Sequence, residues 1–148
     1  MNAEVLKTMI TVDLIVWNEL ACLLEKHPEE NLHGPSSPPW TSRDVYAHFA
    51  RWFNHNNACI EAYSAGRPLP RLPAAAEEMN AVWEKEDQRL TLGEARRKAG
   101  VALASRLAAI EAVPLDKWDA ELQRIVSYDG AMHFAAHLNY IVRENPKQ

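Results

Sequence analysis

The sequence predicts an all-α fold, a bundle of four main helices. Apolar residues recur at spacings of three and four through most of the chain, which is typical of helices that bury one side. Strand signals are scarce, and residues 122–127 form the only short candidate. A stretch with one glycine and three prolines, residues 64–73, is expected to be the long crossover between the second and third helices, so that it joins two halves of the bundle.

The first helix is expected over residues 5–24. It ends before His27 and Pro28, because the residue that precedes a proline avoids the helical region. Residues 29–39 contain one glycine and three prolines, which predicts a loop that borders a pocket. The apolar side of the first helix consists of Leu6, Met9, Ile10, Val16, Trp17, Leu20 and Leu24.

The second helix is expected to begin at Thr41 or Ser42. Thr41 and Asp44 have the spacing of a capping box, with aspartate in place of the usual glutamate. One face of this helix carries the apolar residues Val45, Phe49, Trp52, Ile60 and Tyr63.

Three further helices and one turn account for the rest of the chain. A helix is expected over residues 74–89, and a second capping box, Thr91 with Glu94, starts the next helix, which continues to about residue 112. Residues 114–118 are expected to form a single turn, and the last helix is expected over residues 129–143. The apolar stripe of the helix that follows Thr91 consists of Ala95, Val101, Leu103, Leu107 and Ile110.

The composition is that of one ordinary globular domain, residues 1–148. The chain has 148 residues, of which 47% are apolar and 24% are charged, both near globular averages. A chain of this length can build a sufficient core without disulfides or a structural metal. These values exclude a disordered tail, a collagen-like fibre and a disulfide-stapled miniprotein.

Charge and hydropathy exclude several partners. The chain has 16 basic and 20 acidic residues, and its longest basic run has three residues, Arg96 to Lys98, so we expect no nucleic-acid partner. No run of 18 apolar residues occurs, so we expect no membrane partner. The first residues lack the pattern of a signal peptide, which predicts a cytoplasmic location.

Histidines are the sharpest chemical feature of the sequence. His133 and His137 are four residues apart on the last expected helix, where two imidazoles can bind one metal ion. His48 lies at the edge of the apolar face of the second helix, and His55, one heptad later, is its rival as a third ligand. The alternative is that these histidines have structural roles, bonded to water or to the backbone.

Several motifs together resemble the DinB/YfiT-like superfamily. They are Trp40-x-x-Arg43-Asp44-Val45-x-Ala47-His48-x-x-x-Trp52, an alanine-rich middle with Asn80, and Met132-His133-x-x-x-His137. The chain is most similar to ClbS/DfsB-type proteins and to the N-terminal domains of mycothiol-dependent maleylpyruvate isomerases. The resemblance extends over about residues 5–143.

This resemblance implies an up-down-down-up four-helix bundle, and it maps the metal triad of the family onto His48, His133 and His137. It further implies a divalent ion, most often zinc or nickel, and a homodimer. An ion held by three imidazoles keeps its full charge and can activate water or a low-molecular-weight thiol cosubstrate. We therefore expect a hydrolase or thiol S-transferase that acts on an electrophilic small molecule. The alternatives are a small-molecule binding protein and a structural dimer module on the same bundle.

Four residues are candidates for the substrate pocket. Trp40 and Trp52 flank His48 in the sequence, and Tyr140 lies beside His137 on the last helix. Asp13 interrupts the apolar stripe of the first helix, where a carboxylate needs a partner. It is expected to orient a histidine, to act as a general base, or to turn toward water.

Asp44 and Asp129 each precede a histidine of the triad by four residues. One interpretation is that they accept a hydrogen bond from an imidazole. The other is that they are acidic residues favoured near helix N-termini by the helix dipole.

Overall fold

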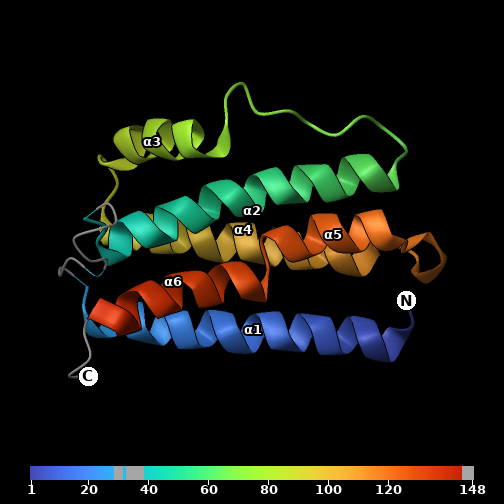
Figure 1. The fold of residues 1–148 in the computed structure, drawn as a ribbon, viewed down its shortest axis with the longest axis horizontal. Coiled ribbons are helices and arrows are strands. Elements are labelled where there is room, and N and C mark those ends of the chain that lie inside the picture. Colours follow the sequence, from blue (N-terminus) through green and yellow to red (C-terminus); the bar gives the residue numbers. More distant parts are fainter. Residues whose placement is uncertain (29–31, 33–38, 145–148) are drawn as a thin grey trace.

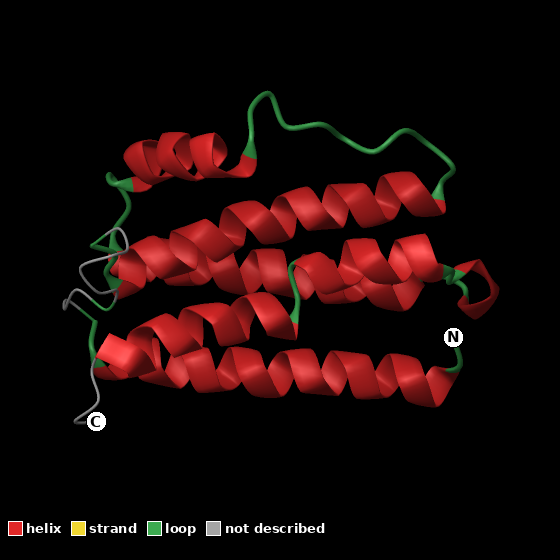
Figure 2. Ribbon diagram, viewed as in Figure 1, coloured by secondary structure: helices red, strands yellow, loops and turns green. Residues whose placement is uncertain are grey.

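The computed structural model describes residues 1–28, 32 and 39–144, with side chains up to residue 141. All regular structure in this part of the chain is helical, which confirms the all-α prediction (Figure 2). No helix in the described ranges is both long and apolar enough to cross a bilayer. The elements are α1 (Ala3–Lys26), α2 (Ser42–Ser64), α3 (Ala76–Asp87), α4 (Leu92–Ala112), the short 3-10 helix η1 (Leu115–Lys117), α5 (Ala120–Tyr128) and α6 (Ala131–Glu144).

The long helices lie side by side along one axis (Figure 1). Helices α2 and α4 run in one direction, and α1 runs in the opposite direction. Helices α5 and α6 follow one after the other, and both run in the same direction as α1. The connection between α2 and α3, residues 65–75, runs back along the outside of α2, close to the expected crossover at residues 64–73.

The strand candidate at residues 122–127 is wrong, because this segment belongs to α5. Leu122, Ile125 and Val126 are buried, and their spacing of three and four is helical. The helix is capped at its start by Asp119, whose Oδ1 accepts a hydrogen bond of 2.9 Å from the backbone N–H of Leu122. The last helix begins at Ala131, two residues later than expected, because Asp129 and Gly130 interrupt the helical structure between α5 and α6.

Both capping boxes are confirmed. The backbone N–H of Thr41 donates to Asp44 at 2.9 Å, and the backbone N–H of Thr91 donates to Glu94 at 2.8 Å. The hydroxyl of Ser42 donates to the carbonyl of Leu24 at 2.7 Å, which holds the start of α2 against the end of α1. Between these helices, the expected pocket-border loop lies outside the described residues except for positions 32 and 39.

The core next to the histidines is aromatic. Trp17 of α1 makes edge-on contacts with four rings, at centroid distances of 5.3 to 6.2 Å. These rings are Tyr46, Phe49, Phe53 and Phe134. They come from α2 and α6, so the cluster packs α1, α2 and α6 together and fixes the face that α6 turns toward α2.

Candidate metal centre

The three histidines predicted as ligands converge in the structure. His48 comes from α2, and His133 and His137 come from α6. Each offers a ring nitrogen, and these three atoms all lie within 4.8 Å of one another. In the described part of the chain this is the only group of three or more histidine, cysteine or carboxylate residues so placed.

The spacing of the imidazoles suits a small divalent ion. The Nε2 atoms of His48 and His133 are 3.2 Å apart. Zinc–nitrogen bonds of about 2.0–2.1 Å in tetrahedral geometry place two ligand nitrogens about 3.3 Å apart. The donor set also fits, because imidazole is a ligand that zinc and nickel both accept. These residues could therefore hold a metal ion.

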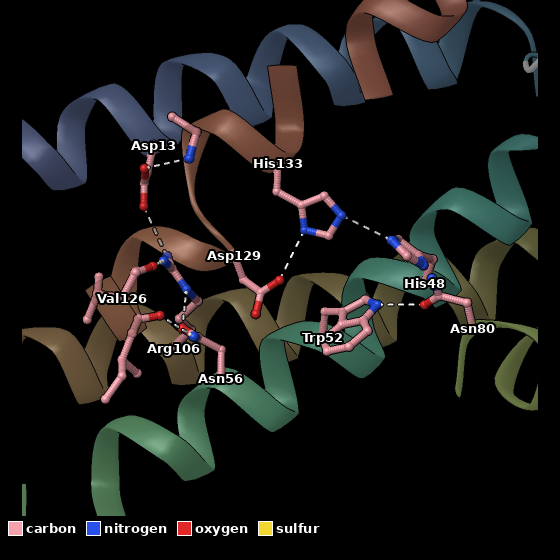
Figure 3. Close-up of polar contacts among 11 residues, drawn as sticks. Asp13, His48, Trp52, Asn56, Asn80, Arg106, Val126, Asp129 and His133 are labelled. Atoms are coloured by element: carbon pink, nitrogen blue, oxygen red, sulfur yellow. Dashed lines mark hydrogen bonds and ion pairs between the residues drawn. The ribbon is translucent and has the colours of Figure 1, made fainter. Parts of the chain in front are cut away.

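Asp129 fixes the orientation of His133. Its Oδ1 is 3.0 Å from Nδ1 of His133, and Asp129 is 1% exposed (Figure 3). Because a carboxylate accepts, this contact places a proton on Nδ1 of His133, and in the neutral imidazole that leaves the lone pair of Nε2 toward His48. This arrangement, a carboxylate behind a histidine, is common at metal sites and strengthens the ligand. Of the two interpretations of Asp129, the structure supports the acceptor.

Aromatic side chains enclose the imidazoles. Phe49 is fully buried, and its ring lies 4.7 Å from that of His133 and 5.0 Å from that of His137, between centroids. Trp40 stacks on His137 at 5.9 Å with an interplanar angle of 10°, and lies 4.8 Å from His48. The site is therefore shielded from bulk water on these sides, which strengthens electrostatic interactions within it.

His55, the rival ligand, is not part of the histidine group. Its Nε2 is 3.7 Å from the sulfur of Cys59, one turn further along α2. Burial raises the pKa of the Cys59 thiol, and the negative charge of Asp129 adds to this effect. Cys59 is therefore held as a neutral thiol.

Three of the four pocket candidates lie near the histidines. The indole N–H of Trp52 donates to Oδ1 of Asn80 at 2.8 Å (Figure 3). Trp40 and His48 border a cavity of about 10 Å³, room for one water molecule. The ring of Tyr140 lies 6.0 Å from that of His137, and Tyr140 is 45% exposed.

A larger pocket opens onto His133. It has a volume of about 300 Å³ and lies between α2, α3 and the junction of α5 and α6. Its lining residues are Trp52, Ala76, Asn80, Tyr128, Met132 and His133. A second pocket of about 270 Å³ shares Trp52, Ala76 and Tyr128 with it and extends toward Cys59 and Arg124.

Asp13, the fourth pocket candidate, has other partners. One of its carboxylate oxygens accepts from Nη1 of Arg106 at 3.1 Å, and the other accepts from the backbone N–H of Ala131 at 2.9 Å. Asp13 is 6% exposed, so it does not turn toward water. The expected need for a partner is met by an arginine and a helix N-terminus.

Sequence reasoning missed Arg106, which is fully buried in α4. A signal was present, because Arg106 lies three residues after Leu103 and four before Ile110, on the apolar stripe of the helix. A charged residue at such a position needs a partner, just as Asp13 does. Two unpaired opposite charges on apolar faces would have suggested the pair.

A comparison with protein-family models supports the resemblance. The model described as the mycothiol maleylpyruvate isomerase N-terminal domain matches residues 14–139, which include all three histidines and Asp129. No curated protein and no solved structure matches the chain. The matched residues cover most of the chain, and the protein therefore belongs to the mycothiol maleylpyruvate isomerase N-terminal domain family, a member of the DinB-like superfamily.

Proposed function

We propose that the protein is a metal-dependent enzyme of the DinB-like type, a hydrolase or a thiol S-transferase. A divalent ion, zinc or nickel, would be held by His48, His133 and His137, and the reactant would be an electrophilic small molecule. The observation that carries the proposal is the convergence of three imidazole nitrogens within 4.8 Å. Three protein ligands leave coordination positions for a reactant, as catalytic sites require.

When bound, such an ion would supply Lewis acidity, which would lower the pKa of bound water to about 7 and would favour the thiolate form of a bound thiol. The residues of the chain have separate tasks. Asp129 holds the proton of His133 on Nδ1 and keeps Nε2 available. Phe49 and Trp40 exclude water from the faces of the imidazoles that they cover.

The pocket beside His133 would receive the electrophile. Its volume, about 300 Å³, is at the lower end of the range for small-molecule sites. The aromatic rings of Trp52 and Tyr128 would pack against a flat apolar group. The name of the family includes mycothiol, a thiol, which supports thiol activation over water activation.

We place this centre in an up-down-down-up four-helix bundle, in which α5 and α6 together make the fourth helix. The directions of the helices in Figure 1 support this topology. The ligands would then come from the second and fourth helices, which are far apart in sequence.

A binding protein without turnover is the second candidate. It is favoured by the close packing around His48, which is 8% exposed and borders a cavity of about 10 Å³. A panel of small thiols with electrophiles separates the two candidates. Thiol or electrophile consumption that is lost in His137→Ala supports the enzyme. Saturable binding without consumption supports the binding protein.

Metal analysis of protein purified without a histidine tag tests the ligand set. We expect about one zinc or nickel ion per chain, lost in each of His48→Ala, His133→Ala and His137→Ala. His55→Ala is the matched control, because His55 lies on α2 outside the group, and it should keep the ion. An ion retained at full stoichiometry in all three ligand variants would overturn the proposal.

A further inference from the structure

The short break between α5 and α6 determines where His133 lies. Helix α5 ends at Tyr128 and α6 begins at Ala131, so Asp129 and Gly130 alone join them. Asp129 binds His133, which is in the first turn of α6. A shift at this break would therefore move the imidazole and its acceptor together, relative to His48 on α2.

Buried side chains hold the α5 side of the break. The last carbonyl groups of a helix have no partner within that helix. In α5, the carbonyl of Val126 accepts from Nη2 of Arg106 at 2.7 Å, and the carbonyl of Ile125 accepts from the side-chain amide of Asn56 at 2.7 Å. Arg106 belongs to α4 and Asn56 to α2, so both helices fix this end (Figure 3).

Asp13 of α1 holds the α6 side. Its Oδ1 accepts from the N–H of Ala131 at 2.9 Å, one of the N–H groups that have no partner within the helix. Its charge also suits the positive end of the helix dipole. Arg106 links the two sides, because it donates to Asp13 Oδ2 at 3.1 Å and to Asn56 Oδ1 at 3.1 Å.

Gly130 makes this close approach feasible. A Cβ atom at position 130 would lie 2.9 Å from Oδ1 and 3.0 Å from Oδ2 of Asp13. Distances below 3.0 Å would force the carboxylate away from Ala131 or from Arg106. The glycine therefore belongs to the same arrangement as the three polar side chains.

We propose that Arg106, Asp13 and Asn56 form a positioning cluster for the metal centre. The cluster holds the end of α5 and the start of α6 in place. Asp129 can then bind His133, and His133 and His137 lie next to His48. Its members come from α1, α2 and α4 and form hydrogen bonds with residues on both sides of the break. Among the described residues, the hydrogen bonds of Arg106 go to Asp13, Asn56 and Val126 and not to the three histidines. The inference rests on the proposed metal-dependent function.

A buried ion pair is by itself weak evidence of a stabilising role. Arg106 is 0% exposed, and burying a charge costs free energy that its partner only partly returns. Replacing a buried ion pair with apolar residues is often neutral or stabilising. One attested use of a buried pair is to fix a single geometry, and this pair contacts the start of a helix that carries two of the proposed ligands.

The test measures Co²⁺ binding and its visible absorption spectrum in Asp13→Asn and Arg106→Lys. Asp13→Asn keeps an acceptor for the N–H of Ala131 but removes the negative charge. Arg106→Lys keeps the positive charge but cannot make the three hydrogen bonds of the guanidinium to Asp13, Asn56 and Val126. We expect both variants to bind Co²⁺ about 10–100-fold more weakly and to show shifted absorption bands. Losses of this size are typical when a residue that orients a metal ligand is replaced. Ile110→Ala, a buried change one turn away on α4, is the control for lost stability and should leave the spectrum unchanged.

A second measurement uses the metal-free protein, where ¹⁵N NMR reports which nitrogen of His133 carries the proton. The Nδ1–H form of the wild type should become mixed in both variants. If both variants fold and keep the wild-type Co²⁺ affinity, absorption spectrum and His133 tautomer, the positioning role of the cluster is overturned. The proposed function is not affected by that result. A wild-type protein that binds no Co²⁺ would instead overturn the proposed function, and the inference with it.

Discussion

At the scale of single residues, Glu25 connects three helices through one carboxylate. Arg96 of α4 donates to it from Nε and Nη2 at 2.7 and 2.8 Å, and the hydroxyl of Tyr46 on α2 donates at 2.7 Å. The hydrogen bonds from Arg96 lower the pKa of Glu25 below its ordinary value of 4.5, against burial, and Tyr46 adds to the lowering. The ionised form is therefore the one that stabilises the fold.

The sign of the pH dependence follows from this lowered pKa. The stabilisation is complete above about pH 4.5, where Glu25 would be ionised even in the unfolded chain, and is lost as pH falls through the lower pKa of the folded state. We expect Glu25→Gln to lower the unfolding free energy at pH 7 by less than about 1 kcal/mol, because the pair is half exposed. The difference from wild type should shrink at pH 3 in urea unfolding. A constant difference from pH 7 to pH 3 would contradict this prediction.

Single residues of the site differ in how far sequence could predict them. His133 and His137 were predictable from their helical spacing and from the family motif, and His48 was predictable from the motif. Asp129 was predictable only as one of two alternatives, because the same spacing suits a dipole effect. Asp13 was identified as needing a partner, but Arg106 lies 93 residues away in the sequence, and only packing brings the two together.

At the scale of helices, local signals predicted most of the elements. Capping boxes at Thr41 and Thr91 and prolines after Lys26 and Ser64 predicted the end of α1, both ends of α2 and the start of α4 within two residues. Helix α5 was missed because nine residues are too few to separate helical from strand periodicity. Its stability comes from buried contacts with other helices, which a short window of sequence does not contain.

Gly130 gives a prediction about the junction of α5 and α6. Gly130→Ala should displace the Asp13 carboxylate and lower the unfolding free energy by about 1–3 kcal/mol, the usual cost of overpacking a buried site. Gly100→Ala is the control, because it lies within α4 with open space around it and should stabilise the protein by about 0.5–1 kcal/mol. Chemical unfolding measures both. Equal effects of the two substitutions would show that the junction has no special requirement for glycine.

At the scale of the whole molecule, the proposed centre joins segments that the chain keeps far apart. His48 and His133 are separated by 85 residues, and their helices meet over the aromatic cluster around Trp17. Composition and periodicity predicted a helical protein with a core, but they do not encode which helices are neighbours. The family motif supplied that information, because it links His48 to the last helix.

Metal removal should therefore weaken the whole fold and not only the site. An ion that binds the folded chain alone stabilises it by about 2.7 kcal/mol at a free concentration 100 times its Kd. For a chain of this length, that corresponds to a rise in Tm of about 5–10 °C. We expect zinc to raise the Tm of chelator-treated wild type and of His55→Ala by this amount, and to leave His137→Ala unchanged, as measured by calorimetry. An equal rise in the Tm of His137→Ala would mean that zinc stabilises the protein from another site, because removal of a proposed ligand would then not change the stabilisation.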